Sequence, residues 1–218
     1  MSLWTLILLP LIGAVCIIPM RATYAKWIAL AVSTIVLIVS ILISVQYEWG
    51  TAEHGLLSDI PWFDFFDISL DLGVDSVALL LVLLTTLLTP LCIWGSFSAI
   101  TSRRREYYAW LLILEAAMVG VFAAQDLILF YVSFELTLLP MFFLIAIYGG
   151  SNRAYASVKF FIYTFTGSLL ALAGFIYVAW QAKLASGSWS FSIDALTLFA
   201  ANNLNSTEQA WVLLALLS

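Results

Sequence analysis

Two glutamates in the middle of long apolar segments, Glu115 and Glu135, are the residues of this sequence whose type and position most favour chemistry. An ionisable side chain at the centre of a membrane-spanning helix costs about 2.5–3.5 kcal/mol, so such a residue indicates function by default. Glu115 lies ten positions before Gln125, and Glu135 lies nine positions after Asp126. At about 1.5 Å of rise per residue, both carboxylates are expected about 15 Å below the turn between them, near the membrane midplane.

Two carboxyl groups in such a layer can carry protons. Desolvation disfavours the charged form of each acid and a negative neighbour disfavours it further, so we expect at least one of them to hold a proton at neutral pH. A cation that moves close would reverse this preference and release the proton. The alternative is that each acid is a permanently protonated, hydrogen-bonded group that only holds helices together.

The residues that follow both acids favour a position inside a helical bundle. Ala116, Gly120 and Ala124 recur every four positions after the first acid and form a row of small residues that lets helices approach closely. Pro140 follows the second acid by five residues and leaves the carbonyl of Leu136 without its helical donor. The helix is expected to bend there, and a free carbonyl beside a carboxylate suits water or ion binding.

A further group of polar residues lies in a later apolar segment. Lys159, Tyr163 and Thr166 follow the i, i+4, i+7 spacing of one helix face and predict a polar stripe that leads from the inner surface toward mid-membrane. Such a stripe could line a proton entry route. The alternative is that Lys159 only extends its ammonium group to the membrane surface.

Composition shows which solvent surrounds the chain. Of 218 residues, 64% are hydrophobic and 10% are charged, whereas soluble domains have about 25% charged residues, so a water-soluble fold is excluded and lipid must be the solvent. Cys16 and Cys92 lie in apolar runs, and His54 is the single histidine, which makes a disulfide framework or a Cys/His metal site unexpected. No phosphate-binding or haem motif occurs, and nucleic acid is not an expected partner because Arg103 to Arg105 is the one basic cluster.

Six apolar runs are long enough to cross a hydrocarbon core about 30 Å thick, which takes about 20 helical residues. The sequence therefore predicts an all-α, polytopic membrane protein in which residues 1–218 form one transmembrane domain. A seventh helix is expected to open at Gln209, and because it would reach only about half-way across the bilayer, we expect an N-terminal part of a longer protein. The six expected complete spans are residues 3–19, 27–45, 74–97, 108–124, 127–148 and 158–181.

Basic residues predict the orientation, because cytoplasmic loops retain Lys and Arg. All of the eight basic residues except Lys183 lie in or beside the connections at 21–26, 103–105 and 153–159. The N-terminus is therefore expected outside, with the odd-numbered connections in the cytoplasm. Residues 46–73 carry several acids and no Lys or Arg, and are expected to form an acidic outer loop.

Three stretches together resemble a known family of membrane proteins. They are LGVDSVALLLVLLTTLLTPL at 72–91, LEAAMVGVFAAQDLILFYVSFELTLLPMFFLIAIYGG at 114–150 and RAYASVKFFIYT at 153–164. This combination is similar to the antiporter-like subunits of respiratory complex I, the proton-translocating NADH:quinone oxidoreductase. Within that family it is similar to the bacterial subunit M (chain 4) branch.

The resemblance implies roles for both acids. Glu135, in FELTLLP, falls on the fifth-helix glutamate that the family uses in proton translocation, and Glu115, in LLILEAAM, falls on its fourth-helix acid. The family's lysine partner of the fifth-helix glutamate, on a broken seventh helix, would lie after Ser218. NADH, flavin, iron–sulfur clusters and quinone are expected in partner subunits, and no cofactor is expected in this chain.

The family implies one leading function and leaves alternatives. The leading function is proton translocation by a membrane-arm subunit in the bacterial inner membrane, driven by remote quinone reduction, with other membrane subunits, lipid and protons as partners. One alternative is a subunit of a multisubunit cation/proton antiporter, which shares the same module and fifth-helix acid. Two further alternatives are a passive assembly scaffold, which the presence of both acids disfavours, and a seven-helix photoreceptor, which a retinal absorption band would identify.

Overall fold

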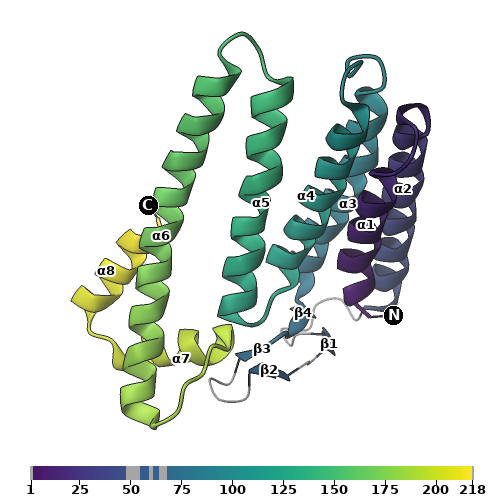
Figure 1. Cartoon of the computed structure of the whole chain (residues 1–218). Helices are drawn as coiled ribbons and strands as arrows, with labels where there is room; N and C mark the ends of the chain where they lie inside the picture. The colour runs from purple at the N-terminus through teal and green to yellow at the C-terminus, as the bar shows by residue number, and fades with distance from the viewer. Residues whose placement is uncertain (1, 48–54, 59–60, 64–67, 218) are drawn as a thin grey trace.

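Eight helices form the part of the chain that the computed structural model describes, residues 2–47, 55–58, 61–63 and 68–217. The first six lie lengthwise beside their sequence neighbours. Of the two short helices that follow, the seventh lies near one end of the sixth and the eighth lies against its middle (Figure 1). Their bounds are α1 Trp4–Ile17, α2 Ala22–Gln46, α3 Ser76–Gly95, α4 Arg104–Ala123, α5 Leu127–Tyr148, α6 Arg153–Ser186, α7 Ile193–Asn203 and α8 Ser206–Leu216.

Five of the described helices, α2 to α6, are long and apolar enough to cross a membrane. The helical membrane fold is therefore confirmed, but the expected count of six complete spans and an opening seventh is not supported. Helix α1 has 14 residues, or about 21 Å of rise, which is less than the hydrocarbon thickness. It ends at Ile17 because Pro19 has no N–H to continue the helical ladder, and the guanidinium of Arg105 instead donates to the Ile18 carbonyl at 3.2 Å.

The chain after α6 also differs from the expectation of a single opening helix. Helix α7 was not predicted, because its eleven residues are too few and too polar to be detected as a span. Helix α8 begins three residues before the expected position, where Asn205 and Glu208 form a capping box. Helix α6 has 34 residues, about 51 Å of rise, and so is longer than the bilayer core is thick.

The two ends of the helices differ in character. The connections α1–α2, α3–α4 and α5–α6, which carry the basic residues, lie together at the top in Figure 1, and the strands lie at the bottom with the N-terminus. These strands, β1 Gly55–Ser58, β2 Pro61–Phe63, β3 Ile68–Ser69 and β4 Leu72–Val74, form the antiparallel pairs β1–β4 and β2–β3. The segment expected as an acidic loop thus contains short strands, and its residues 48–54, 59–60 and 64–67 lie outside the described part of the chain.

The turn between α4 and α5 is held from both sides by extended segments. On one side, the Gln125 N–H donates to the Asp71 carbonyl at 2.9 Å, and the Gln125 side chain donates to the Gly73 carbonyl at 3.0 Å. On the other side, the Leu127 N–H donates to the Phe191 carbonyl at 2.8 Å. The hairpin that carries both acids is therefore fixed at its tip to the segments that precede α3 and α7.

Candidate functional site

The register between α4 and α5 sets the relative depth of the two acids. The Trp110 ring stacks on Phe143 with centroids 4.6 Å apart, and a Cβ on Gly120 would lie 2.8 Å from Ser133 Oγ. Both contacts describe the same antiparallel alignment. In it, Glu115 lies three residues farther from the turn than Glu135, or about 4.5 Å at the helical rise. The two carboxylates are therefore within one helical turn of each other in depth.

Glu115 lies in the core of the α1–α4 bundle. Its side chain is 1% exposed, and neither carboxylate oxygen has a hydrogen-bond partner among the residues that the structure describes. It follows Tyr108 by seven residues, on the same helix face, and Tyr108 contacts α3 through the Ser96 hydroxyl at 3.4 Å. Five residues, about 140° around the helix, separate Glu115 from both Trp110 and Gly120, which contact α5. Glu115 therefore faces the other helices of the bundle and not Glu135.

Glu135 lies on α5, half-buried, and its Oε1 is buried without a hydrogen-bond partner. One turn earlier, the Tyr131 side chain interacts with both the Glu135 carboxylate and the Ser168 hydroxyl of α6. Pro140 is buried inside the same helix, where it leaves the Leu136 carbonyl without its backbone donor. The acid thus has a free oxygen, a phenol and a free carbonyl in its immediate surroundings.

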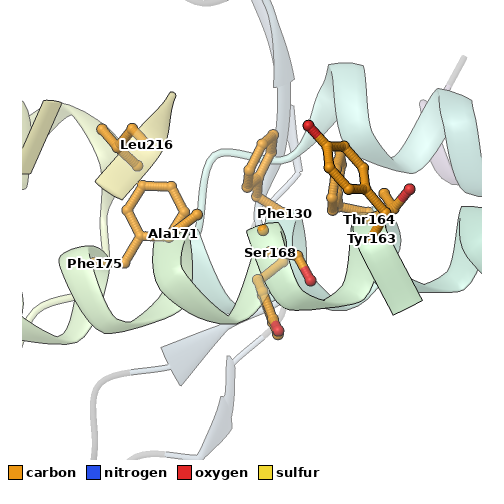
Figure 2. A pocket seen from close by; sticks show the side chains of 10 residues that line it. Phe130, Tyr163, Thr164, Ser168, Ala171, Phe175 and Leu216 are labelled. Atoms are coloured by element: carbon orange, nitrogen blue, oxygen red, sulfur yellow. The ribbon is translucent and has the colours of Figure 1, made fainter. Parts of the chain in front are cut away.

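A cavity of 410 Å³ lies between α5, α6 and α8 (Figure 2), and Tyr131, which interacts with the Glu135 carboxylate, is one of its lining residues. Most of its wall is apolar, as expected in lipid, but four of its lining residues carry a hydroxyl group, Tyr131 on α5 and Tyr163, Thr164 and Ser168 on α6. The remaining lining residues are Phe130, Phe134, Gly167, Ala171, Phe175 and Leu216. A membrane-embedded cavity lined with hydroxyl groups can hold water, which would connect the acid to other proton carriers.

The predicted stripe of Lys159, Tyr163 and Thr166 lies on the exposed face of α6, and Tyr163 is 78% exposed. All three residues line a shallow groove of 540 Å³ that residues of α6 alone form. The groove and the cavity beside Glu135 share Tyr163 and Gly167. Within the described residues, Lys159 makes a cation–π contact of 5.7 Å with the Tyr155 ring, and no ion pair joins it to either acid. The structure therefore brings the stripe to the rim of the cavity, but not to Glu115.

Two residues of this site were missed by sequence reasoning. Tyr131 precedes Glu135 by four residues, so the spacing of one helix face could have identified it. Ser168 could not be found in this way, because it is far away in sequence and only the packing of α6 against α5 places it near the acid.

Comparison with known proteins gives consistent relatives. The family model described as NADH:quinone oxidoreductase/Mrp antiporter, TM, matches residues 124–218. NADH-quinone oxidoreductase subunit M of Rhodobacter capsulatus is 41% identical over 152 residues, which are 70% of this chain and 29% of that protein. NADH-ubiquinone oxidoreductase chain 4 of Marchantia polymorpha is 35% identical over 180 residues, or 81% of this chain and 36% of its own length.

Solved structures share the fold. A chain of respiratory complex I from Thermus thermophilus with bound NADH aligns with a TM-score of 0.79 and 26% identity, covering 98% of this chain and 42% of that chain. A chain of the Mrp complex from Dietzia sp. DQ12-45-1b has the same TM-score of 0.79 at 16% identity, covering 98% and 22%. The present chain thus spans about a third of the length of the curated relatives that it matches. Residues 124–218 match the NADH:quinone oxidoreductase/Mrp antiporter family model, and the chain is a multi-pass inner-membrane protein similar to subunit M, or chain 4, of NADH-quinone oxidoreductase.

Proposed function

We propose that this chain is part of a proton-translocating membrane subunit of NADH:quinone oxidoreductase, and that Glu135 and Glu115 take up and release protons. The observation that carries the proposal is that Glu135 has a buried oxygen without a partner among the described residues and interacts with Tyr131, which lines a cavity between α5, α6 and α8. The unpartnered oxygen leaves the carboxyl group free to bond to water, through which a proton could reach or leave it.

Proton transfer would follow from the movement of a nearby positive charge. A cation that approaches Glu135 stabilises the carboxylate, so the acid releases its proton, and withdrawal of the cation lets it take up another. Quinone reduction elsewhere in the assembly would drive this movement. The chain therefore needs no redox centre of its own, and NADH, flavin, iron–sulfur clusters and quinone would be bound by partner subunits.

A proton route to the acid would begin at the groove on α6. We place the N-terminus outside and the basic connections in the cytoplasm, since these connections lie together at one end of the helices. Protons would then enter along Lys159, Tyr163 and Thr166, and pass into the cavity that shares Tyr163 with the groove. Water and the Tyr131 and Ser168 side chains would complete the path to the carboxylate.

A subunit of a multisubunit cation/proton antiporter is the second candidate function. The family description that matches residues 124–218 covers both classes, and the Mrp chain shares the fold. The higher identity to subunit M and chain 4 favours the oxidoreductase subunit. Sodium-dependent proton exchange without NADH oxidation would reverse this choice.

A Glu135→Gln variant tests the proposal in the assembled complex, reconstituted in liposomes. The amide keeps the shape of the side chain but cannot bind and release a proton, so proton pumping per NADH oxidised should fall severalfold while the complex still assembles. Glu106→Gln is the control, because Glu106 lies exposed at the start of α4, where it only pairs with Arg103 at 3.4 Å. Normal pumping by an assembled Glu135→Gln complex would contradict the proposal.

A further inference from the structure

The core of the α1–α4 bundle has two apolar clusters with a different kind of layer between them. The first cluster lies in the halves of α1 to α4 that are nearer the strands, and each of the four helices contributes to it. The second cluster lies in the opposite halves of the same four helices. On each helix, one residue of the first cluster and one residue of the second lie nearest to the gap between the clusters. In that order, these pairs are Leu6 and Ala14 on α1, Val36 and Ala29 on α2, Val82 and Ile93 on α3, and Val119 and Leu112 on α4. The buried residues between the two members of these pairs are Pro10, Gly13, Ser33, Thr85, Thr86, Pro90, Glu115, Ala116 and Ala117. None of these nine is a large aliphatic or aromatic residue, and Ser33, Thr85, Thr86 and Glu115 are polar. The buried residues at this depth are thus small or polar, and we call them the polar layer.

Contacts between the helices place this layer at the depth of Glu115. A Cβ on Gly13 would lie 2.7 Å from Val32 of α2 and 3.2 Å from Leu112 of α4, so these residues share one depth. Pro10 lies three residues from Gly13, and Glu115 lies three residues from Leu112. Both steps lead toward the strand end of the bundle. Ser96, which follows α3, and Tyr108 on α4 share a hydrogen bond and therefore one depth. Pro90 lies six residues from Ser96 and Glu115 lies seven residues from Tyr108, both toward the strand end. Both prolines are therefore level with the acid.

Each of these prolines frees a backbone carbonyl. Proline has no N–H, so Pro10 removes the helical donor of the Leu6 carbonyl and Pro90 removes that of the Thr86 carbonyl. Both α1 and α3 run from the strand end toward the basic end, so both free carbonyls point along their helices toward the depth of Glu115. Leu6 and Thr86 are fully buried, with 0% exposure, so bulk solvent cannot satisfy these carbonyls.

The hydroxyl groups in and beside the layer are already bonded. Ser40 Oγ and Thr86 Oγ1 form a buried hydrogen bond of 2.8 Å, and the Ser33 hydroxyl donates to the Leu30 carbonyl at 3.1 Å. Among the described residues, neither oxygen of the Glu115 carboxyl group has a hydrogen-bond partner. The Leu6 and Thr86 carbonyls lack the helical N–H that a residue other than proline would supply, so they are the candidate acceptors near it. A protonated carboxyl is a donor, and a water molecule between it and a carbonyl would satisfy both groups.

We propose that the polar layer of the α1–α4 bundle is a second proton-binding site, in which protonated Glu115 is held through buried water by the backbone carbonyls that Pro10 and Pro90 free. The site is separate from the cavity beside Glu135, because Glu115 faces away from α5. Its chemical occupants are an exchangeable proton and water. That this proton is used in translocation rests on the proposed function. That Glu115 carries it does not.

Infrared spectroscopy of the assembled complex in lipid tests the site directly. We expect a protonated-carboxyl C=O band at neutral pH that disappears in Glu115→Gln and shifts in D2O, because water reaches the proton. Pro90→Ala restores a donor for the Thr86 carbonyl and so competes with the water, which should move the band toward the frequency of a more weakly hydrogen-bonded carboxyl. Pro140→Ala is the matched control on α5 and should leave this band in place.

Several results would overturn the proposal. A band absent at neutral pH would mean an ionised Glu115, and a band that D2O does not shift would mean an acid without water. A band that Pro90→Ala leaves unchanged would remove the role of the free carbonyl, and loss of the band on addition of Na+ but not K+ would make the layer a sodium site. A density map of the wild-type assembly that resolves water provides a test without substitutions, in which water between the Glu115 carboxyl and either carbonyl supports the site and its absence contradicts it.

The outcome for Glu135 separates this inference from the proposed function. If Glu135→Gln leaves pumping intact while the Glu115 band behaves as described, the proposed function fails and the second site stands. If Glu135→Gln abolishes pumping while the Glu115 band is missing, the proton-translocating function and the role of Glu135 stand, and the second site fails together with the role proposed for Glu115.

Discussion

Gly120 of α4 and Ser133 of α5 touch across the hairpin that carries the two acids, and this contact leaves no space for a side chain at Gly120. A Cβ built there would lie 2.8 Å from Ser133 Oγ and 3.2 Å from Ser133 Cβ. The distance to Ser133 Cβ shows that the two backbones would have to move apart, because a hydroxyl can rotate away but a Cβ moves only with its backbone. The contact therefore sets the spacing of α4 and α5 and the relative depth of Glu115 and Glu135.

Substitution of Gly120 should separate these helices. Gly120→Val places two methyl groups as well as the Cβ against Ser133, and overpacking of this kind costs about 1–3 kcal/mol. We expect a lower thermal unfolding midpoint of the assembled complex in detergent and a smaller yield of assembly. Gly95→Ala is the control, since a Cβ on Gly95 meets nothing within 4 Å. If both variants unfold at the wild-type temperature, the close contact does not determine the packing.

Asp126 fixes the start of α5. Its Oδ1 accepts hydrogen bonds from the Ile128 N–H at 2.8 Å and the Leu129 N–H at 3.2 Å, so it satisfies two of the free donors at the helix N-terminus. Asp126→Ala should lower the free energy of unfolding by about 1 kcal/mol, and Asp126→Asn should lose less because the amide oxygen still accepts. Thermal unfolding of the two variants side by side measures the difference, and equal losses would point to the charge instead of the cap.

The long helices were predictable because each crossing needs its own apolar run and cannot take its hydrophobicity from elsewhere. Helix α5 has the expected bounds, because Asp126 and the glycines after Tyr148 mark its two ends in the sequence. Helix α1 was overestimated, because hydropathy counts Ile18 and Pro19 as apolar although the backbone ends its helix before them. Helix α8 begins at the capping box of Asn205 and Glu208, and both α7 and α8 pack against α6; hydropathy reports neither feature.

The candidate site divides in the same way. Both acids could be identified because a buried carboxylate is costly wherever it lies, and depth follows from counting residues from the turn. The helices that the two acidic side chains face could not be identified. Helix periodicity gives the angle between two residues on one helix, but it does not show which neighbouring helix packs against a given face. Only the contacts of Trp110 with Phe143 and of Tyr108 with Ser96 show that Glu115 faces away from α5.

Tyr131 should control proton delivery to Glu135. Its side chain interacts with the acid and with Ser168, and it lines the cavity. Tyr131→Phe removes the hydroxyl and keeps the ring, so we expect pumping per NADH oxidised to fall severalfold with little change in thermal stability. Tyr24→Phe is the matched control, since Tyr24 lies exposed on α2. Unchanged pumping in Tyr131→Phe, together with loss in Glu135→Gln, would mean that protons reach the acid by another route.

Lys159 distinguishes a proton entry route from a surface anchor. Its ammonium lies 5.7 Å from the Tyr155 ring on the exposed face of α6, at the rim of the groove that meets the cavity at Tyr163. If the groove admits protons, Lys159→Gln should reduce pumping severalfold at unchanged assembly, and Lys159→Arg should not restore it, because a guanidinium does not give up its proton. A lysine that only anchors the helix would instead be replaced fully by arginine. Lys183→Gln is the control at the opposite end of α6, where the ammonium lies 4.3 Å from the Trp189 ring, and it should pump at the wild-type rate.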